Sequence, residues 1–154
     1  MNAAVRRRAP VSSPLSAEDA ARRLPLVRAI VADLVALHRD LSERRERLGR
    51  IRKLPGGKRR EASVYAEELE QIEEEITRDD ETLNGYLAEL ESLGGAVRDF
   101  DSGCVEFAGE IDGNPVLFGW RQGNDDISYW RTAEPDDSVE HPLMEGSVSQ
   151  DDAT

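Results

Sequence analysis

The chain has 154 residues with 20 basic and 32 acidic side chains, a formal net charge of −12, one cysteine and two histidines. A single cysteine excludes an internal disulfide, and so few cysteines and histidines leave no zinc site of recognisable spacing. No apolar run approaches the roughly 18 residues of a membrane-spanning helix, and the arginine-rich start lacks the apolar core of a secretory signal. We therefore expect a cytoplasmic protein with no membrane partner.

The net charge hides an asymmetry along the chain. Residues 1–60 carry 16 basic and 6 acidic side chains, whereas residues 61–154 carry 4 basic and 26 acidic ones. The densest basic stretch, residues 44–60, comes shortly before the densest acidic stretch, residues 67–81. Such blocks are either partner-binding surfaces or faces that meet each other in the fold.

A long first helix is predicted to begin after residue 16. Ser16 provides a hydroxyl N-cap, and the carboxylate of Asp19 three residues later completes a variant of the capping box. Apolar residues then recur at steps of three and four from Val27 to Ile51, with one polar exception, until the sequence Leu54-Pro55-Gly56-Gly57 ends the helix. Pro25 is expected to kink this helix near residues 21–24 or to separate a short leading turn.

A second helix shows the same spacing from Ala62 to Val97, and the pair Gly94-Gly95 is expected to stop it or fray its last turn. Two long helices joined by a short turn at residues 54–60 should lie antiparallel and coiled-coil-like. We therefore assign residues 15–97 to a helical hairpin.

The register of this hairpin follows from folding the chain about the Gly56–Gly57 bond. Both apolar seams then coincide, Arg44 faces Leu69 and Arg45 lies near Glu68. Asp79, the polar exception in the second seam, faces Leu34. Most of the charge asymmetry thus becomes pairing between the two helices. A helix from Ala17 to Leu54 is about 57 Å long, too long to bury its seam on so few other residues, so a second copy forming a four-helix bundle is expected.

Residues 98–132 are predicted to form a small three-stranded antiparallel meander that packs on the hairpin. The hydrophobic period changes to two at Cys104–Phe107, and a turn at Asp112-Gly113-Asn114 leads to a strand with Val116, Phe118 and Trp120 on one face. A third strand covers Ile127–Arg131. The predicted fold is therefore α+β, flanked by a basic tail at residues 1–14 and an acidic tail at 133–154, both expected to be disordered.

These residues carry a resemblance to a known family. The quoted motifs are Leu15-Ser16-Ala17-Glu18-Asp19-Ala20, Leu24-Pro25, Asp101-Ser102-Gly103-Cys104-Val105-Glu106-Phe107, Asp112-Gly113 with Val116, Trp120-Arg121, Gly123 and Trp130. Over roughly residues 15–143 the sequence resembles the bacterial family described as domain of unknown function 2203. The resemblance implies the fold and the class; it transfers no mechanism, because the family carries no established activity.

The sequence departs from the pattern of that family at three places. The family often has a cysteine just before the first tryptophan and a histidine just after the second, where this chain has Gly119 and Arg131. Its closing stretch is also changed and leaves His141-Pro142-Leu143. Any metal or thiol chemistry based on the cysteine and the histidine of the family would be absent from this chain.

No catalytic, metal-binding or cofactor-binding residue emerges from the sequence. The consecutive acids Glu73–Glu75 point around their helix, and that helix contains no histidine for a di-metal carboxylate site. His38 flanks the apolar seam and is expected to be structural or exposed. Cys104 has no basic neighbour in sequence that could activate it as a nucleophile.

Two groups of residues are candidates for binding a partner. The tip of the hairpin has Lys53, Lys58, Arg59 and Arg60, which could bind phosphates. The meander has two tryptophans, each followed by an arginine, a composition favoured at interaction hot spots. These sheet residues are Trp120, Arg121, Trp130 and Arg131.

The leading hypothesis from the sequence is a non-enzymatic protein-interaction and oligomerisation module. It would form a homodimer through the hairpin and bind a protein partner, not identified by the sequence, through the sheet or the loop tip. The alternative is a nucleic-acid or ribosome-associated factor that uses the basic tip, which the acidic neighbouring helix and the lack of interleaved aromatic residues disfavour. An enzyme of unseen class ranks third, because no acid–base pair or activated nucleophile is visible.

Overall fold

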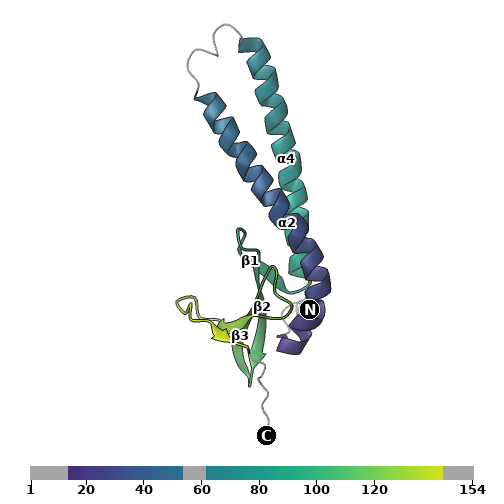
Figure 1. Cartoon of the computed structure of the whole chain (residues 1–154), viewed down its shortest axis with the longest axis vertical. Helices are drawn as coiled ribbons and strands as arrows, with labels where there is room; N and C mark the ends of the chain where they lie inside the picture. Colours follow the sequence, from purple (N-terminus) through teal and green to yellow (C-terminus); the bar gives the residue numbers. More distant parts are fainter. Residues whose placement is uncertain (1–13, 54–61, 144–154) are drawn as a thin grey trace, which may run out of the picture.

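The computed structural model describes residues 14–53 and 62–143. Within these residues the chain forms a helical hairpin followed by an antiparallel sheet, so the predicted α+β class is confirmed (Figure 1). The helices are α2 (Ala17–Arg52) and α4 (Ala62–Ser92). The strands are β1 (Gly95–Asp99), β2 (Cys104–Ile111), β3 (Asn114–Arg121), β4 (Tyr129–Thr132) and β5 (His141–Pro142).

Helix α2 begins as its sequence predicts. The Ser16 hydroxyl accepts a hydrogen bond from the Asp19 backbone N–H at 3.0 Å, and the Ser16 N–H donates to the Asp19 carboxylate at 3.1 Å. These bonds satisfy N–H groups that have no partner within the helix and lower the pKa of Asp19. The helix runs unbroken through Pro25, so a separate leading turn does not form.

The register of the hairpin differs from the expected one. Arg44 binds Asp79 at 2.5 Å, ten residues beyond the predicted partner Leu69. Arg45 likewise binds Asp80 and not Glu68, and Arg52 binds Glu73. In Figure 1 the far end of α4 extends past the end of α2, as these pairs require.

The three ion pairs lie ten to twelve residues beyond the expected partners, which is a displacement of more than one heptad, or about 15–18 Å along the helix axis. A heptad pattern matches itself at every shift of seven residues, so the seam alone does not fix the register. The displaced register brings the two polar exceptions, Arg44 and Asp79, to each other. A charge set against a leucine would be desolvated without a partner, which is the costlier arrangement.

The end of the second helix is also earlier than predicted. α4 stops at Ser92, Gly94 adopts a φ of 90°, and Val97, expected as the last residue of the helical seam, lies in β1 opposite Val105. At Gly95 a Cβ would lie 3.0 Å from a Val105 methyl group, so glycine allows this strand to approach β2 closely. The three- and four-residue spacing of the helix continues by chance into the strand.

The sheet has five strands in the order β1-β2-β3-β4-β5, and all neighbours are antiparallel. The three predicted strands form its centre, with the Asp112-Gly113 turn at φ values of 52° and 82° as an Asp-Gly hairpin requires. β5 lies in the segment 133–154 that was expected to be disordered. Residues 1–13 and 144–154 of the two predicted tails are outside the described residues.

One face of the sheet packs against the helices. Phe107, Phe118 and Trp120 are fully buried there with residues of α2 such as Leu24 and Val27. The contact reaches as far as His38, which stacks on Phe100 at a centroid distance of 4.1 Å. Beyond that point the hairpin projects from the sheet as an arm, which we define as residues 39–53 and 62–79 (Figure 1).

The two helices cover much of each other's seam. Seven-residue steps place Leu34, Leu41 and Leu48 of α2, together with Ile76, Leu83 and Leu90 of α4, in buried positions. Among the described residues the strongly exposed large apolar side chains are Leu26 at 58% and Val139 at 60%. The seam is therefore covered within one chain more fully than the length of the first helix predicts.

Candidate functional site

The outer face of the sheet carries a cluster of charged side chains. Alternation along the strands places every second residue on the face away from the helices, and the strand register brings these residues side by side. The residues on this outer face include Arg98 of β1, Cys104 and Glu106 of β2, Gly119 and Arg121 of β3, and Tyr129 and Arg131 of β4.

Glu106 lies at the centre of this face and is only 8% exposed. Its carboxylate accepts two hydrogen bonds from Arg131, from Nε at 2.7 Å and from Nη2 at 2.9 Å. The Tyr129 hydroxyl donates to it at 2.6 Å and Arg98 at 3.1 Å. Burial opposes ionisation of Glu106, but these donors and charges outweigh burial and hold its pKa below the ordinary value.

Tyr129 of β4 contacts both Arg98 of β1 and Cys104 of β2. Its hydroxyl oxygen accepts a hydrogen bond from Arg98 at 2.7 Å and lies 3.4 Å from the Cys104 sulfur. Burial, together with the contacts to Cys104 and Glu106, raises the pKa of Tyr129. The ring covers Gly119, where a Cβ would lie 2.0 Å from the ring carbon Cζ. Glycine at position 119 is therefore required for this placement of Tyr129.

A second carboxylate completes the cluster. Glu140, in the segment between β4 and β5, accepts hydrogen bonds from Arg98 at 2.9 Å and Arg121 at 2.8 Å. The bond from Arg121 holds the pKa of Glu140 below its usual range. We refer to these charged residues and the tyrosine among them as the ionic cluster. Its members are Arg98, Glu106, Arg121, Tyr129, Arg131 and Glu140.

The carboxylate and the thiol of this face are already engaged with neighbouring side chains. The Glu106 carboxylate already accepts hydrogen bonds from three side chains, which leaves it poorly suited to take a proton from a substrate. The Cys104 thiol is buried beside Tyr129. In the part of the chain that the structure describes, no group of three or more His, Cys, Asp or Glu side chains is arranged to hold a metal ion.

The sheet residues proposed from the sequence do not form one patch. Arg121 and Arg131 belong to the ionic cluster, whereas both tryptophans lie on the opposite face. Trp120 is 1% exposed, and its indole N–H donates to the Asn124 carbonyl at 2.8 Å. Trp130 is half-buried and stacks on His141 at 4.3 Å. Trp120 is thus part of the core, and Trp130 keeps some accessible surface.

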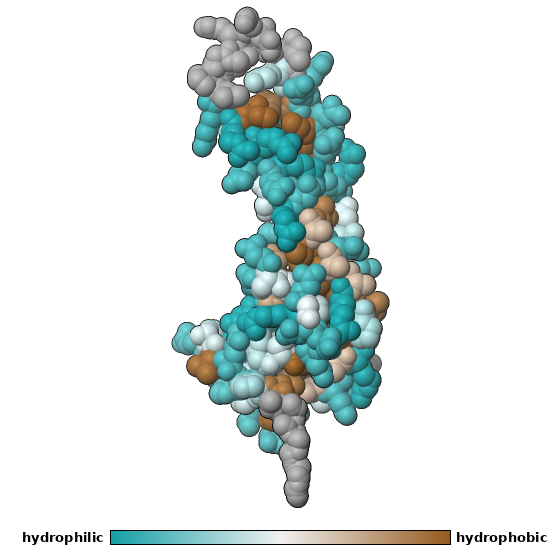
Figure 2. Space-filling view, in the orientation of Figure 1, coloured by the Kyte–Doolittle hydropathy of each residue, from teal (hydrophilic) through white to brown (hydrophobic). Residues whose placement is uncertain are grey.

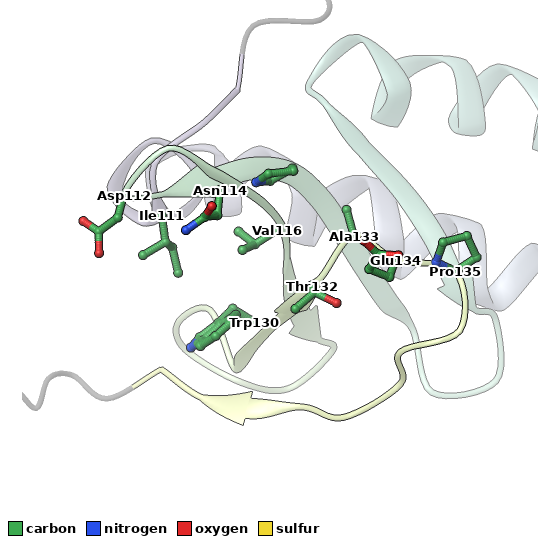
Figure 3. A pocket seen from close by; sticks show the side chains of 10 residues that line it. Ile111, Asp112, Asn114, Val116, Trp130, Thr132, Ala133, Glu134 and Pro135 are labelled. Atoms are coloured by element: carbon green, nitrogen blue, oxygen red, sulfur yellow. The ribbon is translucent and has the colours of Figure 1, made fainter.

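Trp130 borders a hollow of about 810 Å³ (Figure 3). Ile111, Val116 and Thr132 share its face of the sheet, so the hollow continues the apolar face that packs on the helices. The complete lining is Ile111, Asp112, Asn114, Pro115, Val116, Trp130, Thr132, Ala133, Glu134 and Pro135.

The basic tip predicted from the sequence is described only at its start. Lys53 caps the C-terminus of α2, where its backbone N–H donates to carbonyls of the last turn, and it is exposed. Lys58, Arg59 and Arg60 lie outside the described residues.

Four members of the ionic cluster were not singled out by sequence reasoning: Arg98, Glu106, Tyr129 and Glu140. Their positions span more than 40 residues, and only the strand register brings them together. In the sequence Glu106 alternates with Val105 and Phe107 as a solvent-facing residue would, and only the structure shows that residues 104–107 are all buried. A charged residue in such a strand requires a partner.

Comparison with known proteins identifies a family. The model of the family described as "Uncharacterized conserved protein (DUF2203)" matches residues 15–136, and the chain belongs to this family. No curated protein and no solved structure matches the chain. Neither described helix is both long enough and apolar enough to cross a membrane.

Proposed function

We propose that this member of the DUF2203 family is a non-enzymatic protein-interaction module whose arm binds a second copy of the same chain. The observation that carries the proposal is a set of charged side chains of the arm that form no ion pair with another described residue. On α2, Arg47 and Arg50 are exposed and form no ion pair with another described residue. On α4, Glu68 and Glu75 form none either.

Four of the unpaired charges, Arg47, Arg50, Glu68 and Glu75, share one flank of the arm. The pairs Arg45–Asp80 and Arg52–Glu73 lie one residue after seam positions, on the other flank. Arg47 lies one residue before a seam position, as do Glu68 and Glu75. A two-fold related copy that packs along this flank sets its acidic α4 beside the basic α2 of the first copy. Contact between two basic helices is disfavoured by repulsion, so the arrangement selects one pairing.

Apolar surface supports the same contact. Leu69 and Ile72 of α4 pack against the core yet stay only half-buried. Figure 2 shows apolar surface, in brown, between hydrophilic stretches along the hairpin. Packing two arms into a four-helix bundle would remove more of this surface from water, at about 25 cal/mol per Å².

Light scattering after size exclusion tests the self-association. At micromolar concentration and about 50 mM salt we expect a particle of twice the 17.1 kDa chain mass. At about 500 mM salt the exposed charges are screened, and the dimer should weaken. A particle of 17.1 kDa under both conditions would contradict the proposal.

The same run tests the alternative of a nucleic-acid or ribosome-associated factor. That alternative rests on the tip residues Lys53, Lys58, Arg59 and Arg60, of which Lys53 is exposed. The ratio of absorbance at 260 and 280 nm is read in both salts. Nucleic acid that co-elutes at low salt and leaves at high salt would favour the alternative over self-association.

A further inference from the structure

Glu140 occupies a position that a ligand could take. Its oxygen Oε2 accepts hydrogen bonds from two guanidinium groups, Arg98 at 2.9 Å and Arg121 at 2.8 Å. The arginines come from β1 and β3, whereas Glu140 belongs to the segment after β4. The carboxylate is therefore brought to the arginines from outside the strands that hold them.

Groups other than Glu140 hold the two arginines in place. Arg98 donates to the Tyr129 hydroxyl at 2.7 Å and to the Glu106 carboxylate at 3.1 Å. The Arg121 guanidinium carbon lies over the Tyr129 ring, 4.9 Å from its centroid. These contacts remain when Glu140 leaves, so the pair of arginines is preorganised for an anion.

The Glu140 side chain can leave without moving its segment. It is 32% exposed. The segment has its own attachments at Asp137, whose carbonyl accepts a bond from Arg131 at 2.8 Å and whose carboxylate accepts one from Thr132 at 2.6 Å. On the other side, β5 pairs with β4 and His141 stacks on Trp130. Rotation of one partly exposed side chain therefore exposes both arginines.

We propose that Arg98 and Arg121 form a carboxylate-binding site that Glu140 occupies as an internal competitor. Guanidinium groups match the geometry of a carboxylate and bind it through charge-assisted hydrogen bonds. Asp99 lies nearby, but its carboxylate already accepts bonds from the Ser102 N–H at 2.9 Å and the Ser102 hydroxyl at 2.6 Å. Glu140 is thus the carboxylate that a ligand replaces.

A carboxylate of this kind comes either from a small organic acid or from an acidic side chain of a peptide. The shared chemistry is one carboxylate that meets two guanidinium groups beside an aromatic ring. Two probes distinguish the sources: succinate, and a short peptide that contains glutamates and is blocked at both ends. The site does not depend on self-association of the arm, since all its residues lie in the sheet and the segment after it.

Calorimetric titration of the full chain tests the site. Glu140→Gln removes the charge of the internal competitor, so we expect it to bind at least one probe roughly tenfold more tightly than the wild type. Adding Arg121→Gln to this variant should abolish the gain. Succinate binding alone would identify a small-acid site, and peptide binding alone would identify a site for a protein carboxylate.

A matched control and a second readout keep the test decisive. Glu110→Gln removes an exposed glutamate of β2 from the outer face of the sheet, and this variant should bind the probes like the wild type. The Arg121 Nε–Hε resonance of the wild-type chain should shift at high probe concentration, which requires no variant. Equal affinity of wild type and Glu140→Gln, binding that survives Arg121→Gln, or no binding of either probe at tens of millimolar would overturn the proposal.

Discussion

The arm and the outer face of the sheet both bring opposite charges together, but they do so in different surroundings. On the sheet, Glu106 and Arg131 are 8% and 14% exposed and form two hydrogen bonds with each other. On the arm, Arg45 and Asp80 are 48% and 42% exposed. Buried charges are costly to separate, whereas exposed ones exchange partners readily. Separating Glu106 from Arg131 should therefore cost much more stability than separating Arg45 from Asp80.

The largest loss of stability is expected at Glu106, at the centre of the outer face of the sheet. Glu106→Ala leaves the largely buried Arg131 without its carboxylate and should lower the free energy of unfolding by about 3–5 kcal/mol. Urea denaturation at pH 7 measures this loss. The double variant Glu106→Leu with Arg131→Met replaces both charges by apolar groups and should recover most of it. A loss below about 1 kcal/mol for Glu106→Ala would show that the pair behaves like an exposed one.

A smaller effect is expected at Gly119. A Cβ there would lie 2.0 Å from the Tyr129 ring, so Gly119→Ala should displace the ring and cost about 1–3 kcal/mol. Gly85→Ala is the matched control, because position 85 lies in α4 with open space around it and should gain up to about 1 kcal/mol. Thermal unfolding of both variants compares them. Equal stability of Gly119→Ala and the wild type would mean that the ring does not depend on this glycine.

The helices and the central hairpin of the sheet show how far the sequence predicts the structure. The heptad spacing from Val27 onward predicts two helices and their seam, and Asp112-Gly113 predicts the central hairpin of the sheet. The spacing cannot fix the register, because the pattern repeats every seven residues. It also extends to Val97 and thereby hides β1.

The ionic cluster was less accessible to sequence reasoning than the helices. Arg121 and Arg131 were singled out because each follows a tryptophan, yet the structure places the tryptophans on the opposite face. The partners of these arginines, Glu106 and Glu140, are set by contacts between distant strands. Local spacing carries no information about such contacts.

In the arm, the pair of Arg44 and Asp79 should couple by about 1 kcal/mol. Arg44 is largely buried and Asp79 is not, so the coupling lies near the upper end for exposed pairs. A double-mutant cycle with Arg44→Ala and Asp79→Ala, followed by urea denaturation, measures it. The cycle between Arg45 and Glu68 is the control and should give no coupling. Coupling between Arg45 and Glu68 without coupling between Arg44 and Asp79 would instead support the register predicted from the sequence.

Glu106 and Glu140 of the ionic cluster should contribute to the pH dependence of stability. Glu106 and Glu140 have pKa values below the ordinary 4.5, so they stabilise the fold above that pH and lose this contribution as the pH falls through their lowered values. Urea midpoints between pH 7 and pH 3 should therefore fall below about pH 4.5, and less steeply for Glu106→Gln. Equal slopes for the two proteins would contradict this assignment.

Charge reversal on the arm tests the central claim most directly. One variant carries Arg47→Glu and Arg50→Glu on α2, and the other carries Glu68→Lys and Glu75→Lys on α4. Each variant alone sets like charges against each other across the contact, so light scattering at low salt should show particles of 17.1 kDa. Mixed in equal amounts, the two should form a heterodimer, because opposite charges face each other again. A mixture that stays monomeric while the wild type dimerises would contradict the account, as would variants that dimerise alone.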